Sequence, residues 1–306
     1  TLAVVFNFAC HPIQGVPSGG NTADLSGFAC KVIEDCSDDG TIALFLQGCA
    51  GDINPVRYKD VEQPRDAEPL GNLLGLSTLR ALRNIRTEED GTLKIVNKTL
   101  ALPRADLTEP IAALQEQQQQ LLHSLKGTTL NLKTFMPLMV KYHLAPDAPS
   151  YYSHRYLHEE KLGSNHLAKL DADNRSNLER YLENIHTMEE LTRVQANLAL
   201  LQMHQAQNQI AGTDTIDVEL IGLRIGNFVM TTFPGELSVQ TGLNLKQASP
   251  HPLTFIAGVT NGYIYYTPTA QQLDNRGGAQ EDSDCLLAPE WQALYEKKAV
   301  EILRAL

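Results

Sequence analysis

The spacing of hydrophobic and polar residues predicts alternating strands and helices in the first third of the chain. Apolar runs at 1–10 and 41–48 predict buried strands, and the second run leads into the turn CAGDINP. Between them, residues 23–36 have the periodicity of an amphipathic helix, and a second helix is predicted at 70–85. Residues 91–103 then alternate as a strand does. This order of elements is typical of an α/β fold.

The middle third of the chain has a different pattern, which is polar and helical. Gln and Leu dominate the sequence after Thr108, and residues 175–207 form one long polar stretch with helical periodicity. Between these helices, the Pro- and Tyr-rich segment 142–154 predicts a loop or lid.

Strand signals return in the last third. Residues 215–233 predict two strands joined between Gly222 and Gly226, and a third strand is predicted at 253–263. Residues 288–306 predict a closing amphipathic helix.

Together these patterns predict an α/β fold with mixed β-sheets flanked by helices, a layered α/β sandwich, that carries a helical insertion. The predicted division is 1–107 for the first part of an α/β catalytic domain, 108–210 for the helical insertion, and 211–306 for the second part of the domain.

Charge and composition narrow the possible partners. The chain has 25 basic and 36 acidic residues, and its net charge of -11 disfavours binding to a nucleic-acid backbone. No run of 18 apolar residues occurs, so no transmembrane segment is predicted. The five cysteines are too few and too irregularly spaced for a disulfide framework, and none forms a CxxC pair.

The sequence pattern of the first residues predicts a buried strand from Thr1 onward. This segment has no Met, no basic region and no cleavage-site pattern of a signal peptide. We interpret the chain as part of a longer precursor, whose own N-terminal segment would then be a candidate partner.

Two arrangements of histidine could bind a metal. His154 and His158 have the i, i+4 spacing that places two ligands on one helical face, but no HExxH pattern accompanies them, which favours solvated surface histidines. His11 follows an apolar strand directly, where it would face a cleft, and a satisfied core histidine is the competing interpretation.

The same pattern, a predicted strand followed by a residue that could bind a metal or a proton, occurs three times. The residues are His11 in CHP, Glu236 in PGE, and the tyrosines of TNGYIYY. If these strands share one sheet, their ends meet at one rim. A histidine, a carboxylate and a third oxygen ligand with an open position form a catalytic zinc arrangement. For Glu236 the alternative is that it only begins the next helix.

Four sequence blocks resemble the neutral/alkaline (non-lysosomal) ceramidases and their bacterial relatives. They are NFACHP with ADLSG, FLQGCAGDINP, FPGELSVQTG, and GVTNGYIYYTPT leading to GGAQEDSDCLLAPE. In that family the corresponding histidine, glutamate and second tyrosine bind one zinc ion, which implies Zn²⁺ at His11, Glu236 and Tyr266. The resemblance implies hydrolysis of an N-acyl amide bond by metal-activated water, a role in sphingolipid metabolism, and a secreted or periplasmic location.

The chain also departs from the family pattern. A further zinc-binding histidine of the family, in a Thr-His-x-His-type segment, has no counterpart here. Asn54 stands where ceramidases carry a serine, and Ala279 where a tyrosine is expected. A serine nucleophile at that place is thereby excluded, and one partner for proton transfer or for an oxyanion is missing.

Three further residues complete the predicted site: Asp24 and Asp52 as groups that orient it, and Tyr263 beside the predicted ligand. For Asp24 the alternative is helix capping, and for Asp52 it is turn formation.

The leading hypothesis is therefore a zinc-dependent amide hydrolase acting on a small-molecule or lipid-like N-acyl substrate. The alternatives are a non-catalytic binding protein with a degenerate site, or a metal-dependent esterase. The loops QGVPSGGNT and DNRGGAQEDSD are small or polar, which predicts a substrate smaller or more polar than long-chain ceramide.

Overall fold

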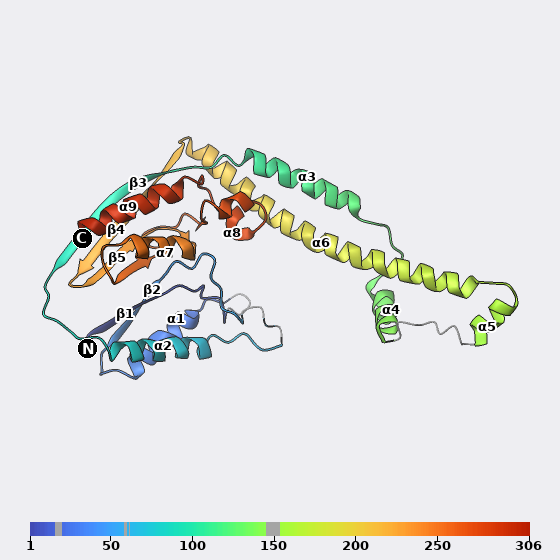
Figure 1. Cartoon of the computed structure of the whole chain (residues 1–306), viewed down its shortest axis with the longest axis horizontal. Coiled ribbons are helices and arrows are strands. Elements are labelled where there is room, and N and C mark those ends of the chain that lie inside the picture. The colour runs from blue at the N-terminus through green and yellow to red at the C-terminus, as the bar shows by residue number, and fades with distance from the viewer. Residues whose placement is uncertain (16–19, 58–59, 61, 145–153) are drawn as a thin grey trace. The chain divides into compact units, whose positions relative to one another are not determined.

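The computed structural model describes residues 1–15, 20–57, 60, 62–144 and 154–306, and it divides into two compact units (Figure 1). Unit 1 comprises Thr1–Pro110 and Ala199–Leu306, and unit 2 comprises Ile111–Leu198. Strands and helices alternate along unit 1, whereas unit 2 is helical, so the chain has the predicted α/β character with mixed sheets. The predicted loop at 142–154 lies almost wholly outside the described residues.

The first part of unit 1 is a two-stranded parallel sheet covered by two helices. Its elements are β1 (Ala3–Phe8), α1 (Asp24–Asp35), β2 (Ile42–Gln47) and α2 (Glu68–Leu82). Val4 and Phe6 point toward Ala29 and Ile33 of α1 and form a small core with Ala43. The periodicity of the sequence follows from this arrangement, because alternate strand residues and one helix face are buried.

Helices α1 and α2 touch at two glycines of α2. A Cβ on Gly71 would lie 2.6 Å from the Leu25 carbonyl oxygen, and one on Gly75 would lie 2.9 Å from the Ala29 carbonyl oxygen. The small residues in this helix therefore allow a close backbone approach.

We expect Gly71→Ala to lower the free energy of unfolding by about 1–3 kcal/mol, because the added methyl group must push the helices apart. Urea denaturation measures the change. Gly91→Ala is the matched control, since no atom lies within 4 Å of its Cβ position, and it should change stability by less than about 0.5 kcal/mol. Equal effects of the two substitutions would contradict the close contact.

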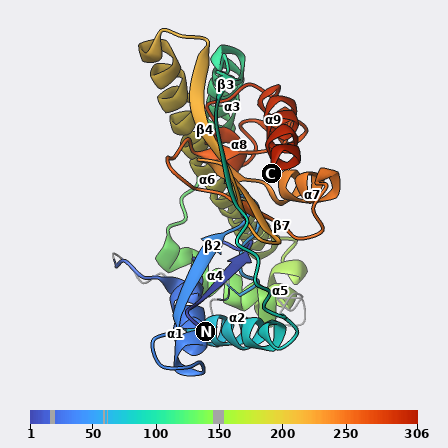
Figure 2. The same cartoon turned by 90° about the vertical axis from the view of Figure 1, so that its left-hand side faces the viewer.

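The second part of unit 1 is a four-stranded sheet in the order β3-β4-β5-β7. Its strands are β3 (Leu93–Pro103), β4 (Thr215–Ile225), β5 (Phe228–Thr232) and β7 (Thr254–Ala257). Pairing is antiparallel except between β5 and β7. Helices α7 (Val239–Ala248) and α9 (Trp291–Ala305) lie beside this sheet (Figure 2). The largest core of the chain lies here, around the buried rings of Phe233, Trp291 and Tyr295.

Four short elements lie outside this sheet, and two of them carry Glu236 and Tyr266 of the candidate site. Strands β6 (Glu236–Leu237) and β8 (Tyr266–Thr267) form a parallel pair, followed by the 3-10 turn η1 (Gln272–Asn275) and the helix α8 (Gln280–Ser283). The strand predicted at 253–263 ends at Ala257, because Val259 and Asn261 adopt positive φ angles of 52° and 60° and turn the chain out of the sheet.

Unit 2 contains α4 (Leu132–Leu144), α5 (His154–Lys161) and most of α3 (Thr108–Ser124) and of the 46-residue helix α6 (His166–Ala211). Phe135 and Tyr142 of α4 form a small core with Leu178 of α6. Across the described residues, no helix is long and apolar enough to cross a membrane. His154 and His158 lie in α5, which has no buried residue.

All five cysteines are free thiols in the described part of the chain. Cys10, Cys49 and Cys285 are buried, Cys30 is partly buried, and Cys36 is exposed at the end of α1. Burial raises the pKa of the Cys49 thiol to about 12 and that of Cys285 to about 11.

Candidate functional site

A tight turn brings Glu236 and Tyr266 together. The turn Pro234–Gly235 ends the buried segment that includes Phe233 and places Glu236 at the start of β6, directly opposite Tyr266 at the start of β8. The Glu236 backbone N–H donates a 2.9 Å hydrogen bond to the Tyr265 carbonyl oxygen. Two side chains that are 30 residues apart in sequence are thereby fixed as neighbours by backbone pairing.

His11 reaches the same place from the end of β1. Its backbone N–H donates to the Ile53 carbonyl oxygen at 2.8 Å, and its ring Nδ1 lies 3.3 Å from that oxygen. When both ring nitrogens carry protons, Nδ1 donates to this carbonyl and Nε2 donates to the Glu236 carboxylate. Loss of the Nε2 proton, with Nδ1 still donating, would leave Nε2 as the atom that could bind a metal.

The three predicted ligands converge. His11 Nε2 lies 2.8 Å from Glu236 Oε2 and 3.1 Å from the Tyr266 hydroxyl oxygen. Both the His11 and Glu236 side chains are largely buried, at 15% and 17% exposure. The competing interpretation of Glu236 as a plain helix start does not fit, because β6 begins at Glu236 and α7 only at Val239.

The donor atoms fit part of a zinc site. Zinc binds nitrogen and oxygen at about 2.0–2.2 Å in a tetrahedron, so two donors on one ion lie roughly 3.3 Å apart. The observed separations of 2.8 and 3.1 Å need only a slight widening. Among the described residues, no group of three or more His, Cys, Asp or Glu side chains could hold a metal. The candidate site has only two such side chains, and its third donor is the phenol of Tyr266. These three residues could therefore supply three donors to a zinc ion, with one position left for another donor.

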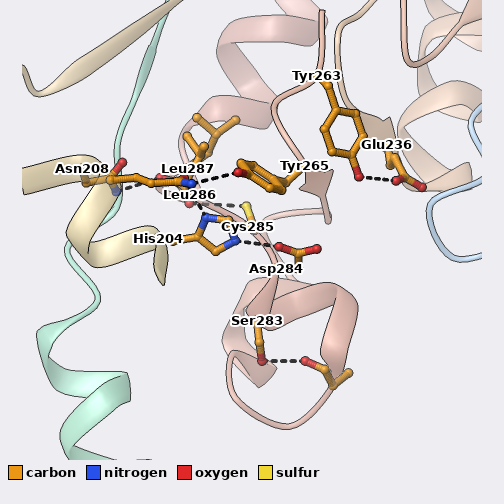
Figure 3. Close-up of polar contacts among 12 residues, drawn as sticks. His204, Asn208, Glu236, Tyr263, Tyr265, Ser283, Asp284, Cys285, Leu286 and Leu287 are labelled. Atoms are coloured by element: carbon orange, nitrogen blue, oxygen red, sulfur yellow. Dashed lines mark hydrogen bonds and ion pairs between the residues drawn. The ribbon is translucent and has the colours of Figure 1, made fainter. Parts of the chain in front are cut away.

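The charges of the site follow from these contacts. The hydrogen bond to Glu236 raises the pKa of His11 more than burial lowers it. For Glu236, burial favours the neutral acid, but the hydrogen bonds from His11 and Tyr263 outweigh it and lower the pKa of this carboxyl. Burial and the adjacent carboxylate raise the pKa of both Tyr263 and Tyr266. The Tyr263 hydroxyl accordingly donates to Glu236 Oε1 at 2.6 Å (Figure 3).

A polar cleft of about 250 Å³ opens beside Tyr266. Asn54 and Ala279, the two positions that depart from the ceramidase pattern, both line it. A second hollow of about 640 Å³ also borders Asn54, and its wall includes Phe8, Pro55 and Leu73. Asn54 therefore borders both the polar cleft beside Tyr266 and the hollow that Phe8 and Leu73 line.

The fold was compared with solved structures. A neutral ceramidase from Pseudomonas aeruginosa aligns over 99% of this chain, with a TM-score of 0.53 and 17% sequence identity. A ceramidase complexed with C2 aligns over the same share, with a TM-score of 0.52 and 16% identity. The chain has a ceramidase fold. It spans less than half of either neighbour, 44% and 45% of their lengths.

The resemblance inferred from the four sequence blocks is thereby confirmed at the level of the ceramidase fold. No known protein family and no curated protein matches the sequence itself.

The expectation that the three strand ends belong to one sheet holds for two of them and is wrong for the third. Strand β5, before Glu236, and strand β7, before the tyrosine stretch, are parallel neighbours in the four-stranded sheet, whereas β1, before His11, belongs to the β1-β2 sheet. Backbone hydrogen bonds join segments of different sheets: the Gly258 N–H donates to the Gln47 carbonyl, and the Gly51 N–H donates to the Leu237 carbonyl. Gly51 is required there, because a Cβ would lie 2.6 Å from the Glu236 carbonyl oxygen.

Asp52 lies at the edge of the cleft. One of its oxygens accepts from the Val239 backbone N–H at the start of α7 at 2.7 Å, and the other accepts from Gln272 at 3.0 Å. It therefore caps a helix from another segment and fixes one wall of the cleft.

Asp24 has a local role. It is 1% exposed and accepts from the backbone N–H groups of Gly15 and Leu25, both at 2.7 Å. It thereby ties Gly15 to the start of α1. The N-cap of this helix is Ala23, without a side-chain cap hydrogen bond, so these contacts differ from the capping alternative weighed for Asp24.

The sequence offered little sign of one further group. His204, which lies in the polar helical stretch 175–207, is fully buried, and its Nε2 lies 2.7 Å from Asp284 Oδ1 (Figure 3). The available signal was its position near the end of the long helix, where polar periodicity gives way to Leu200 and Leu201.

Proposed function

We propose that this chain carries the catalytic part of a zinc-dependent hydrolase that cleaves an N-acyl amide bond. The observation that supports it most is the convergence of His11 Nε2, Glu236 Oε2 and the Tyr266 hydroxyl beside a polar cleft. The ceramidase fold agrees with this proposal.

Zinc at these donors would supply polarisation of the amide carbonyl and activation of water. The residues of the chain have separate tasks. Tyr263 holds Glu236 Oε1 and so keeps Oε2 turned toward His11. The ionised carboxylate of Glu236 favours a cation between it and the histidine. The departing amine needs a proton, and Asp282, a cleft residue whose carboxyl pKa is raised by burial, is suited to hold one.

The two hollows support a substrate with two unlike ends. The cleft beside Tyr266 is lined by Asp52, Ser238 and Gln272 and suits a polar group. The hollow across Asn54, with Phe8 and Leu73, suits an apolar acyl group. We propose an N-acyl substrate with a compact polar amine, with long-chain ceramide cleaved poorly.

A substrate panel tests this function on the full-length protein after chelation and reloading with zinc. We expect zinc-dependent hydrolysis of short N-acyl amides, lost in His11→Ala, and a much slower reaction with long-chain ceramide in detergent. Preference for ceramide would contradict the proposed substrate.

The panel also separates the two rival functions. Cleavage of matched esters without amides would make the chain an esterase. Bound zinc with no cleavage of any substrate would favour a binding protein, the alternative that Asn54 and Ala279 in the cleft support.

A further inference from the structure

The backbone between the two site tyrosines is strained. Tyr265 has a φ of 66°, a left-handed conformation that is uncommon for an aromatic residue and persists only when its surroundings impose it. Its carbonyl oxygen accepts the Glu236 backbone N–H at 2.9 Å. The conformation of Tyr265 therefore sets the position of Glu236 relative to Tyr266.

The side chain of Tyr265 is held by the last turns of α6. Gln207 Nε2 donates to the Tyr265 hydroxyl at 2.8 Å, and the His204 ring meets the Tyr265 ring edge-on, with centroids 4.6 Å apart. The other face of this cluster is Tyr263, whose ring centroid lies 5.4 Å from that of Tyr265. Both α6 residues belong to unit 1, as do the tyrosines.

A second path runs from the same helix end to Tyr266. His204 is fully buried, and its Nε2 lies 2.7 Å from Asp284 Oδ1. The backbone carbonyl of Asp284 accepts the Tyr266 N–H at 3.1 Å. Burying polar groups such as His204 and Asp284 costs free energy unless they are hydrogen-bonded. Once they are hydrogen-bonded, the pair favours one fixed geometry.

We propose that His204 and Gln207 are positioning residues that clamp the site from the end of α6. Gln207 fixes Tyr265, whose carbonyl holds Glu236. His204 fixes Asp284 (Figure 3), whose carbonyl holds Tyr266. The metal-binding role of Glu236 and Tyr266 rests on the proposed function, but the clamp itself acts on the backbone and does not need a metal.

The first test uses the metal-free, full-length protein and its amide hydrogen exchange. We expect Gln207→Leu to speed exchange at the Glu236 amide, and His204→Leu to speed it at the Tyr266 amide, by at least about ten-fold. Amides of α9 should keep their wild-type rates. His204→Gln, whose Nε2 can still donate to Asp284, should restore most of the protection at Tyr266. Unchanged exchange at Glu236 and Tyr266 in both leucine variants would overturn the proposal.

The second test measures zinc affinity by competition with a chromophoric chelator. Residues that only orient a ligand typically alter affinity about 10–100-fold, and we expect losses in that range for Gln207→Leu and His204→Leu. His251→Leu is the matched control, since it removes another histidine hydrogen bond in unit 1, from Nε2 to the Leu303 carbonyl at 2.8 Å, and should leave zinc affinity unchanged. Zinc affinity that stays at the wild-type value in both leucine variants would overturn the clamp. If the wild type itself binds no zinc, the proposed function fails, and the exchange rates alone decide the clamp.

Discussion

Replacing Glu236 with alanine should abolish zinc-dependent hydrolysis and leave the protein folded. The substitution removes the carboxylate that lies 2.8 Å from His11 Nε2, and with it one of three convergent donors. Groups that merely orient a metal ligand cost about 10–100-fold when removed, so loss of the ligand itself should exceed about 100-fold. The side chain makes hydrogen bonds but fills no core, so the expected loss of unfolding free energy is about 1 kcal/mol.

Elemental analysis, activity and thermal unfolding of the same preparations measure these effects. Glu301→Ala is the control, because this exposed carboxylate on α9 pairs only with Lys298 among the described residues. Wild-type zinc content in Glu236→Ala would rule out the metal role. Global unfolding of Glu236→Ala would instead show that the turn needs this side chain for its structure.

Phe233→Ala should be among the most destabilising single changes in unit 1. Phe233 is fully buried, and its ring centroid lies 4.4 Å from that of Tyr295 and 5.7 Å from that of Trp291. Truncating a buried Phe costs about 3–5 kcal/mol, a large part of the roughly 5–15 kcal/mol that stabilises a typical protein. Because Phe233 directly precedes the turn that holds Glu236, zinc affinity should also fall.

The fluorescence of Trp291, the one tryptophan of the chain, reports urea unfolding of this core directly. Phe228→Ala provides the comparison, since that ring is only partly buried against Phe255 and should cost clearly less. A loss for Phe233→Ala no larger than that for Phe228→Ala would contradict the assigned core.

The elements of the fold were predictable where the pattern was long and regular. The helix predicted at 23–36 is α1, Asp24–Asp35, and the strand predicted at 41–48 is β2, Ile42–Gln47. The grouping of strands into sheets was not predictable, because pairing between distant segments depends on contacts that no local pattern encodes. That is why one sheet was assumed for all three strand ends, whereas β5 and β7 pair with each other and β1 pairs with β2.

For the site, the strand-end pattern predicted that His11, Glu236 and one of the three tyrosines converge, because strand ends tend to carry exposed functional groups. The choice of Tyr266 rested on the resemblance to the ceramidases. The convergence of His11, Glu236 and Tyr266 is observed, and their role as metal ligands stays a prediction. His204 was missed because its burial is imposed by the segment that contains Asp284, which is 80 residues away. Local periodicity in a Gln-rich helix carries no trace of such a partner.

The distribution of free thiols has a practical use in following this protein. Cys10, next to His11, and Cys285, next to Asp284, are buried, and burial raises the pKa of both thiols, so neither presents a reactive thiolate at neutral pH. Cys30 is partly buried, and Cys36 is exposed at the end of α1. A maleimide fluorophore should therefore attach first at Cys36, which labels the protein at the end of α1 and leaves the thiols beside His11 and Asp284 unmodified.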